Sequence, residues 1–203
     1  MDVRLTSIQN AKDVRPSSFA LKWNDLMALF AEQAETARPV SDKDQFRLPA
    51  LYPTVYQENA FRKSKTNVIG YGAWTAVDID HVMSFEELRE FFKIHSLDGC
   101  LYTTTSYSKE DPRVRGVFLL SREIELSEFD EFWYALNEFF GHKLDPQTKN
   151  INRIYYVPAK WNEHALFERV IGKELDVDAL LNMFPYPHLR APLVYAIPLA
   201  PSM

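Results

Sequence analysis

Hydrophobic and polar positions follow two different periods along the middle of the chain, and the change between them predicts where strands and helices lie. Short runs rich in β-branched and aromatic residues predict strands. Apolar residues three or four positions apart behind a capping residue predict helices. The resulting elements, in chain order, are a strand at 68–79, a helix after a capping box of Ser84 and Glu87, strands at 99–105 and 113–120, a helix opened by Ser127 and Asp130, and a strand at 152–157.

This order, β-α-β-β-α-β, is the split βαβ pattern of an α+β, RRM-like fold. It predicts one antiparallel sheet of four strands with both helices on one face, which leaves the other face open for function. In the usual arrangement the first strand lies between the third and the fourth and runs antiparallel to both. The end of the first strand then meets the beginnings of the other two.

The remaining segments flank a core expected at residues 61–160. Residues 1–60 are expected to pack on it as a helical and irregular extension, with apolar residues at helical spacing over 19–30 and an irregular wrap over 37–56. Residues 161–203 are expected to form a helical segment capped by Asp176, followed by a proline-rich tail.

Composition narrows the class of protein. With 203 residues, 46% of them hydrophobic and 25% charged, the chain is typical of a globular protein. No apolar run could span a bilayer and no signal peptide follows Met1, so we expect a cytoplasmic protein without a membrane partner. Cys100 is the single cysteine, which excludes an intrachain disulfide and a cysteine-based zinc cluster. The net charge of −5 argues against broad electrostatic binding of nucleic acid.

The first predicted strand ends in two acids, Asp78 and Asp80. Alternate side chains share one face of a strand, so these carboxylates should point the same way with their stems about 6 to 7 Å apart. Such a pair suits a divalent metal ion. A solvated turn at the end of a strand is the alternative explanation.

Arginines should lie beside these acids. Arg113 and Arg115 open the third strand, on the face opposite its core residues, and Arg153 opens the fourth. Asp145, in the loop before the fourth strand, could reach the same rim. Carboxylates with arginines suit Mg²⁺ or Mn²⁺ and the phosphates of a nucleotide. Interstrand salt bridges are the alternative.

At these residues the chain resembles the archaeo-eukaryotic primase superfamily, particularly the primase-polymerase-like domains of phage and plasmid replication proteins. The resemblance covers about residues 60 to 160. It rests on three stretches, Val77-Asp-Ile-Asp80, Tyr102-Thr-Thr-Thr-Ser-Tyr107 with Arg113-Val-Arg-Gly-Val-Phe-Leu-Leu-Ser-Arg122, and Leu144-Asp145 with Asn152-Arg-Ile-Tyr-Tyr-Val-Pro158.

The resemblance implies metal-dependent, template-directed transfer of nucleotides, with a nucleoside triphosphate and a single-stranded DNA template as partners. Primase-like domains are often joined to a helicase, so it also implies a replicative helicase as a partner. The catalytic and metal-binding positions, for Mg²⁺ or Mn²⁺, carry over to Asp78, Asp80 and Asp145. The expected nucleotide and phosphate contacts are Ser106, Arg113, Arg115 and Arg153, and the expected nucleic-acid contacts are Arg62, Lys63, Lys65 and Lys149.

The second motif departs from the family. Its usual Ser-x-His ends in a histidine that contacts nucleotide phosphates, and Arg115 stands in that place. An arginine can hold a triphosphate, but it does not exchange a proton at neutral pH.

Two other functions fit parts of the pattern. Asp78-Ile-Asp80-His-Val82 fits the motif of haloacid dehalogenase-type phosphatases, in which Asp78 would be the nucleophile and Asp80 a general acid or base. Against it, a later acidic metal motif and repeated βα units are missing. A non-catalytic RRM-like nucleic-acid-binding module would share the topology. Such modules stack bases on exposed aromatic residues, for which Tyr155 alone is a weak platform.

Overall fold

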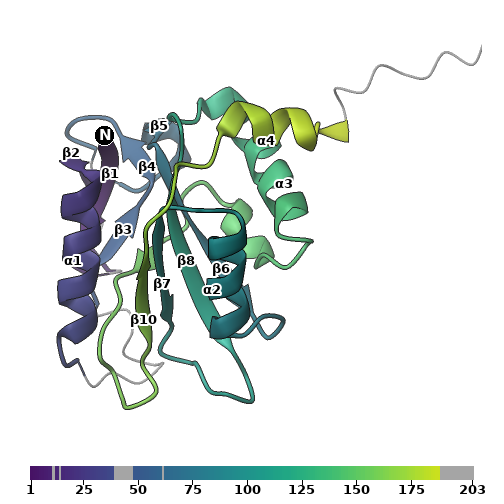
Figure 1. Cartoon of the computed structure of the whole chain (residues 1–203). Helices are drawn as coiled ribbons and strands as arrows, with labels where there is room; N and C mark the ends of the chain where they lie inside the picture. Colours follow the sequence, from purple (N-terminus) through teal and green to yellow (C-terminus); the bar gives the residue numbers. More distant parts are fainter. Residues whose placement is uncertain (11, 14, 39–47, 61, 188–203) are drawn as a thin grey trace, which may run out of the picture.

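The computed structural model describes residues 1–10, 12–13, 15–38, 48–60 and 62–187, which form an α+β structure with helices on both sides of a central sheet (Figure 1). The strands are β1 (Asp2–Ile8), β2 (Ser17–Lys22), β3 (Ala50–Tyr52), β4 (Thr54–Tyr56), β5 (Val68–Tyr71), β6 (Trp74–Asp80), β7 (Gly99–Thr103), β8 (Arg113–Leu119), β9 (Tyr155–Tyr156) and β10 (Phe167–Val170). The α-helices are α1 (Trp23–Glu35), α2 (Phe85–Ile94), α3 (Phe129–Phe139) and α4 (Val177–Met183). Short 3₁₀ turns are η2 (Lys65–Asn67), η3 (Leu126–Glu128) and η4 (Pro146–Lys149).

The central sheet has the strand order β10-β7-β8-β6, and each of its pairings is antiparallel. A second sheet has the order β2-β1-β3-β9, and β4 pairs with β5. The predicted neighbours β6, β8 and β7 are therefore adjacent as expected. Their register places Asp78 opposite Arg115 and Asp80 opposite Arg113.

Several predicted elements keep their position but change their bounds. The capping box of Ser84 and Glu87 opens α2 as expected. The helix predicted to open at Ser127 begins at Phe129, after η3. In the N-terminal part, α1 begins at Trp23, and residues 17–22 form a strand instead of the first helical turn.

The predicted strand at 68–79 is divided into β5 and β6 around Gly72. A Cβ atom at Gly72 would lie 2.1 Å from the carbonyl oxygen of Arg4, so only glycine allows β1 to pass this closely.

The central sheet is buried on both faces. On one face, Val77, Val114 and Phe118 pack with α2 and α3, and on the other, Val117 and Leu119 pack with α1 and β1. Figure 1 shows α1 on one side of the sheet and α2 on the other. This corrects the prediction of an open sheet face, because the N-terminal elements cover it. It also explains why β6 carries apolar residues on both faces, Trp74 and Ala76 on one and Val77 and Ile79 on the other, since its first six residues are all buried.

The strand order differs from the RRM-like arrangement predicted from the sequence. The predicted fourth strand forms only the two residues of β9, and these pair with β3 of the second sheet. Just before it, the amide of Arg153 bonds to the carbonyl of Asn150 at 2.7 Å, so the chain turns there and does not extend along β6. Asp145 donates its backbone N–H to the carbonyl of Asp78 at 2.9 Å, and this contact takes up part of the edge of β6.

The C-terminal helix predicted after Asp176 is present, but residues 167–170, expected in a helical segment, form β10 of the central sheet. The side chain of Asp176 accepts a hydrogen bond from the amide of Ala179 and caps α4. Most of the predicted proline-rich tail, from 188 onward, lies outside the described residues, as does 39–47 of the predicted wrap. Within the described ranges, no helix is long and apolar enough to cross a bilayer.

The close contact of β7 with β8 gives a stability prediction. A Cβ atom at Gly99 would lie 1.9 Å from the carbonyl oxygen of Val117, and this backbone atom belongs to a paired strand that cannot move alone. Gly99→Ala should lower the free energy of unfolding by about 3 kcal/mol or more. Gly141→Ala is the control. Gly141 has a φ of +62° but open space around it, so the change should cost only about 1 kcal/mol. Urea denaturation followed by circular dichroism measures both, and equal costs would contradict the prediction.

Candidate functional site

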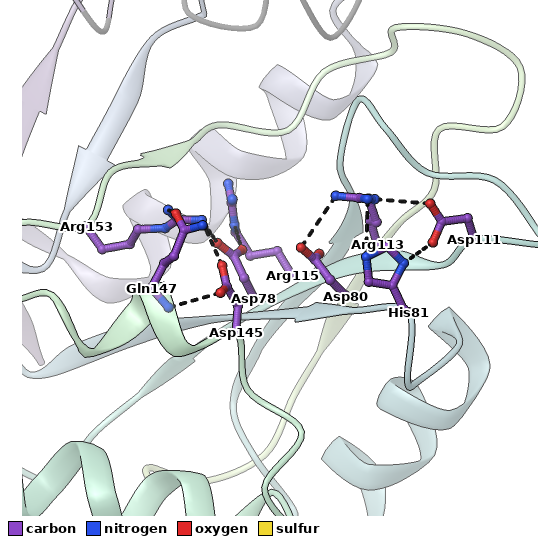
Figure 2. A network of polar contacts seen from close by, with 9 residues as sticks. All are labelled: Asp78, Asp80, His81, Asp111, Arg113, Arg115, Asp145, Gln147 and Arg153. Atoms are coloured by element: carbon purple, nitrogen blue, oxygen red, sulfur yellow. Dashed lines mark hydrogen bonds and ion pairs between the residues drawn. The ribbon is translucent and has the colours of Figure 1, made fainter.

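The candidate site lies where β6 ends and β8 begins, next to the loop that contains η4 (Figure 2). Cross-strand pairing brings two acid–arginine pairs together, one buried and one at the rim. The loop adds a third carboxylate and a third arginine. The predicted residues that meet in this network are Asp78, Asp80, Asp145, Arg113, Arg115 and Arg153.

The inner pair, Asp78 and Arg115, is almost completely buried, with 3% and 6% of the residue surface exposed. Arg115 Nε donates to Asp78 Oδ1 at 2.5 Å, and its Nη1 donates to the carbonyl oxygen of Tyr156 at 3.0 Å. The guanidinium carbon lies 5.6 Å from the ring centre of Tyr102 and 5.2 Å from that of Tyr155. Cation–π attraction and charge-assisted hydrogen bonds therefore replace the water that this charge has lost.

Electrostatics keep Arg115 charged in this setting. Burial lowers the pKa of its guanidinium, but the charge of Asp78, together with Tyr102 and the hydrogen bonds to both, outweighs burial, so the net shift is upward. Burial raises the pKa of the Tyr102 hydroxyl, which stays neutral and donates to the carbonyl of Tyr156 at 2.8 Å. The pair is thus a fixed ionic contact. Arg115 Nε and Nη1 already have protein partners, and phosphate contact by Arg115 stays a prediction.

Arg153 joins the inner pair to the loop. Its Nη2 lies 3.1 Å from Asp78 Oδ2 and 3.2 Å from Asp145 Oδ2, so one nitrogen is shared by two carboxylates. Its Nη1 donates to Gln147 Oε1 at 2.6 Å. Its Nε is buried and has no hydrogen-bond partner among the described residues.

Local structure explains how the loop presents Asp145. The Asp145 carboxylate caps η4 by accepting the amide of Gln147 at 3.0 Å, and Pro146 occupies the first position of that turn. Thr148 is buried and accepts a hydrogen bond from Trp133 Nε1 at 3.0 Å, which fastens the turn to α3. The acid is therefore held by a capped turn that packs on a helix.

The outer pair, Asp80 and Arg113, lies at the rim. Arg113 Nη1 is 3.6 Å from Asp80 Oδ2, and Arg113 also contacts Asp111 at 3.4 Å and His81 Nε2 at 3.2 Å. His81 and Asp111 contact each other as well. Burial and the charge of Asp78 raise the pKa of the Asp80 carboxyl above its ordinary value, against the opposing charge of Arg113. Asp145 adds to this rise, so the three acids are close enough to influence one another.

Some predicted contacts lie outside the network. Ser106 is half-buried in the turn between β7 and β8. Lys149 lies on η4, exposed, with its Nζ 5.8 Å from the ring centre of Trp133. Arg62, Lys63 and Lys65 lie on the segment that leads into β5. The network in Figure 2 includes none of these five residues, so their roles as nucleotide or nucleic-acid contacts stay predictions.

The sequence analysis missed four members of the site. Tyr102 and Tyr155 flank Arg115, Gln147 holds Arg153, and Asp111 holds Arg113. Asp111 lies two positions before Arg113 in a polar turn, and this spacing was a usable signal. Tyr155 was considered only as a platform for bases and Tyr102 only as part of a strand, and nothing in the sequence marks Gln147.

The chemistry of the donors fits a hard divalent cation. All three acids offer carboxylate oxygens, which Mg²⁺ and Mn²⁺ prefer. A positive group, Arg153 Nη2, already lies between Asp78 and Asp145. As they stand, the described residues hold no group of three or more His, Cys, Asp or Glu side chains placed to bind a metal ion. The residues therefore fit a cation that would take the place of Arg153.

The hollow beside Arg115 is too small to hold a nucleotide. A hollow of about 20 Å³ is lined by Tyr102, Arg115 and Trp161 among others, which is room for about one water molecule. A nucleotide would have to approach from the rim, where the side chains of Asp80 and Arg113 are about one-third exposed.

The two alternative functions, a haloacid dehalogenase-type phosphatase and an RRM-like binding module, each require a structural feature that differs from this geometry. Haloacid dehalogenase-type phosphatases require a sheet of repeated βα units, whereas β6 pairs antiparallel with β8. An RRM-like module requires exposed aromatic residues on an open sheet face, whereas Tyr155 is only 3% exposed beneath the N-terminal elements.

Comparisons with known proteins agree with the fold. No protein-family model matches the sequence, and no curated protein sequence matches it. Among solved structures, the chain is similar to the AEP domain of the primase-polymerase of cyanophage S-2L, with a TM-score of 0.50 and 11% sequence identity over 90% of this chain and 89% of that one. At this identity the likeness concerns the fold alone. This chain has a fold of the kind found in the AEP domain of a phage primase-polymerase.

Proposed function

We propose that this protein is a primase-like nucleotidyltransferase of phage or plasmid DNA replication. One observation supports this most directly. Within an AEP-like fold, the cross-strand register and the η4 loop bring three carboxylates and three arginines together at the end of β6. The proposed partners are a nucleoside triphosphate and a single-stranded DNA template, with a replicative helicase as a further partner.

The proposed reaction is in-line nucleotidyl transfer. The oxygen of a 3′-hydroxyl forms a bond to the α-phosphorus of the incoming nucleotide. The bond from that phosphorus to the bridging oxygen breaks, pyrophosphate leaves with the electron pair, and the hydroxyl proton passes to solvent. A bound Mg²⁺ or Mn²⁺ would supply neutralisation of the charge that develops on the attacking and leaving oxygens.

The exposure of each residue determines the role that we propose for it. Asp80 and Asp145, with Asp78 behind them, are the proposed cation ligands. Arg113 and Arg153 are the proposed phosphate contacts, because their side chains are 31% and 25% exposed. Arg115 is buried and its described contacts are with the protein, so we assign it to holding Asp78 in place.

Removal of the rim carboxylate tests the activity. The protein is incubated with a single-stranded DNA template, labelled nucleotides and Mn²⁺ or Mg²⁺, and incorporation is followed by gel electrophoresis. Asp80→Asn keeps the shape but removes the charge, so incorporation should fall by about a hundredfold or more. The control Asp25→Asn changes an exposed acid on α1 and should leave incorporation unchanged. Incorporation that survives Asp80→Asn contradicts the proposal, and nucleotide binding without incorporation in the unaltered protein favours a non-catalytic binding module.

A loss of activity in Asp80→Asn should not come from unfolding. The folded protein holds Asp80 with a raised pKa, so its contribution to stability is complete below the unfolded pKa and is lost as pH rises through the folded pKa. At neutral pH the ionised carboxylate therefore lowers the free energy of unfolding. Asp80→Asn should be at least as stable as the unaltered protein at pH 7, as measured by urea denaturation.

The structural role assigned to Arg115 gives a separate prediction. Arg115→Met leaves Asp78 buried with one partner fewer, and breaking a buried ion pair in this way costs about 3–5 kcal/mol. Arg113→Met breaks a pair at the rim and should cost about 1 kcal/mol or less. Chemical denaturation of both variants compares the losses. If Arg115→Met is no less stable than Arg113→Met, Arg115 does not hold the site together.

A further inference from the structure

We propose that Arg153 occupies the cation position of the site in the resting protein and leaves it when a nucleoside triphosphate binds, so that nucleotide and divalent cation bind cooperatively. This inference rests on the proposed function for the identity of the two ligands. Its evidence is the placement of one side chain.

The position of Arg153 is that of a bridging cation. A single nitrogen, Nη2, lies 3.1 Å from a carboxylate oxygen on β6 and 3.2 Å from one on the η4 loop. These oxygens belong to Asp78 and Asp145, and Figure 2 shows the guanidinium between them. Without Arg153, Asp145 and one oxygen of Asp78 would face each other without a positive charge between them. The same two carboxylates therefore cannot bind a divalent cation fully while Arg153 stays in place.

The two inner arginines are held very differently. Arg115 is enclosed by two tyrosine rings and donates to a carboxylate and a carbonyl. Arg153 is one-quarter exposed, and its Nη1 bonds to Gln147, an exposed residue. Its buried Nε finds no partner in the described part of the chain. A buried donor without a partner costs about 1–3 kcal/mol, so the resting position of Arg153 is incompletely satisfied.

A triphosphate offers Arg153 a better partner. A guanidinium forms parallel hydrogen bonds to two oxygens of a phosphate, and this arrangement can use Nε together with an Nη nitrogen. The backbone of Arg153 lies in a turn just before β9, so its side chain can swing outward without breaking a strand pairing. Movement toward the phosphates would empty the position between the two carboxylates.

Cooperativity follows from this exchange. Nucleotide binding removes the competitor for the carboxylates, and a bound cation displaces Arg153 toward the phosphates. By linkage, each ligand must raise the affinity for the other by the same factor, and couplings of this kind are typically about 5- to 150-fold.

Calorimetric titration with Mn²⁺, with and without a non-hydrolysable nucleoside triphosphate, tests the proposal without measuring activity. In the unaltered protein the nucleotide should tighten Mn²⁺ binding by about tenfold. In Arg153→Met, Mn²⁺ alone should bind about tenfold more tightly than to the unaltered protein, and the effect of the nucleotide on Mn²⁺ should largely disappear. The control Lys143→Met removes one exposed positive charge near Asp145 in the sequence and should leave both the affinity and the coupling unchanged.

A second variant covers the case in which Arg153→Met does not fold. Gln147→Ala changes an exposed residue and removes the partner of Arg153 Nη1, so Mn²⁺ alone should bind about two- to tenfold more tightly. Arg153→Met or Gln147→Ala that binds Mn²⁺ no more tightly than the unaltered protein overturns the proposal, as does a lack of Mn²⁺ binding in all variants.

The test separates this inference from the proposed function. Cooperative Mn²⁺ and nucleotide binding that depends on Arg153, in a protein that incorporates no nucleotide, supports the exchange and rejects the polymerase activity. Nucleotide incorporation by a protein whose Mn²⁺ affinity does not depend on Arg153 supports the polymerase activity and rejects the exchange.

Discussion

The buried ion pair of Asp78 and Arg115 is the interaction on which the arrangement of the site depends. Two charges taken out of water cost several kcal/mol each unless good geometry and further hydrogen bonds compensate for the loss. Here the compensation comes from the carbonyl of Tyr156 and from the rings of Tyr102 and Tyr155. These partners lie on β7 and β9, and β9 belongs to the other sheet. One desolvated pair thereby links two sheets, and the rim residues take their positions from it.

Local patterns predicted the part of the fold that depends on neighbouring residues. The capping box of α2 follows from short-range spacing, the antiparallel pairing of β6 with β8 follows from the order of the elements, and both are confirmed. The partner of β9 and the elements that cover the sheet were predicted wrongly, because both depend on segments distant in the sequence. β3 ends at Tyr52 whereas β9 begins at Tyr155, and α1 ends at Glu35 whereas β6 begins at Trp74. Apolar residues on both faces of a strand such as β6 indicate that both faces are buried, but they do not indicate which segment covers each face.

The candidate site was also predicted in part, since the charges that meet were predicted but their exposure was not. A period of two on β6 and β8, together with the antiparallel topology, was enough to predict that these acids and arginines meet, and the structure pairs Asp78 with Arg115 and Asp80 with Arg113. The exposure of each pair could not be read from the same pattern, because burial of Arg115 depends on the N-terminal elements and on Tyr155. The sequence therefore indicated which charges meet, but not which of them remain accessible to a substrate.

Arg115 differs from the histidine that the primase superfamily, which the sequence resembles, commonly has in its second motif, and this difference affects more than one contact. A histidine can lie neutral beside an acid, whereas a buried guanidinium stays charged and requires a fixed counter-ion. Asp78 supplies that counter-ion through Oδ1, so only Oδ2 is left for another cation. Arg153 Nη2 contacts this oxygen and also contacts Asp145 Oδ2. The work expected of three equivalent carboxylates is thereby divided unequally. Asp78 is engaged by two arginines and Asp145 by Arg153 and the amide of Gln147, whereas the side chain of Asp80 is the most exposed of the three acids.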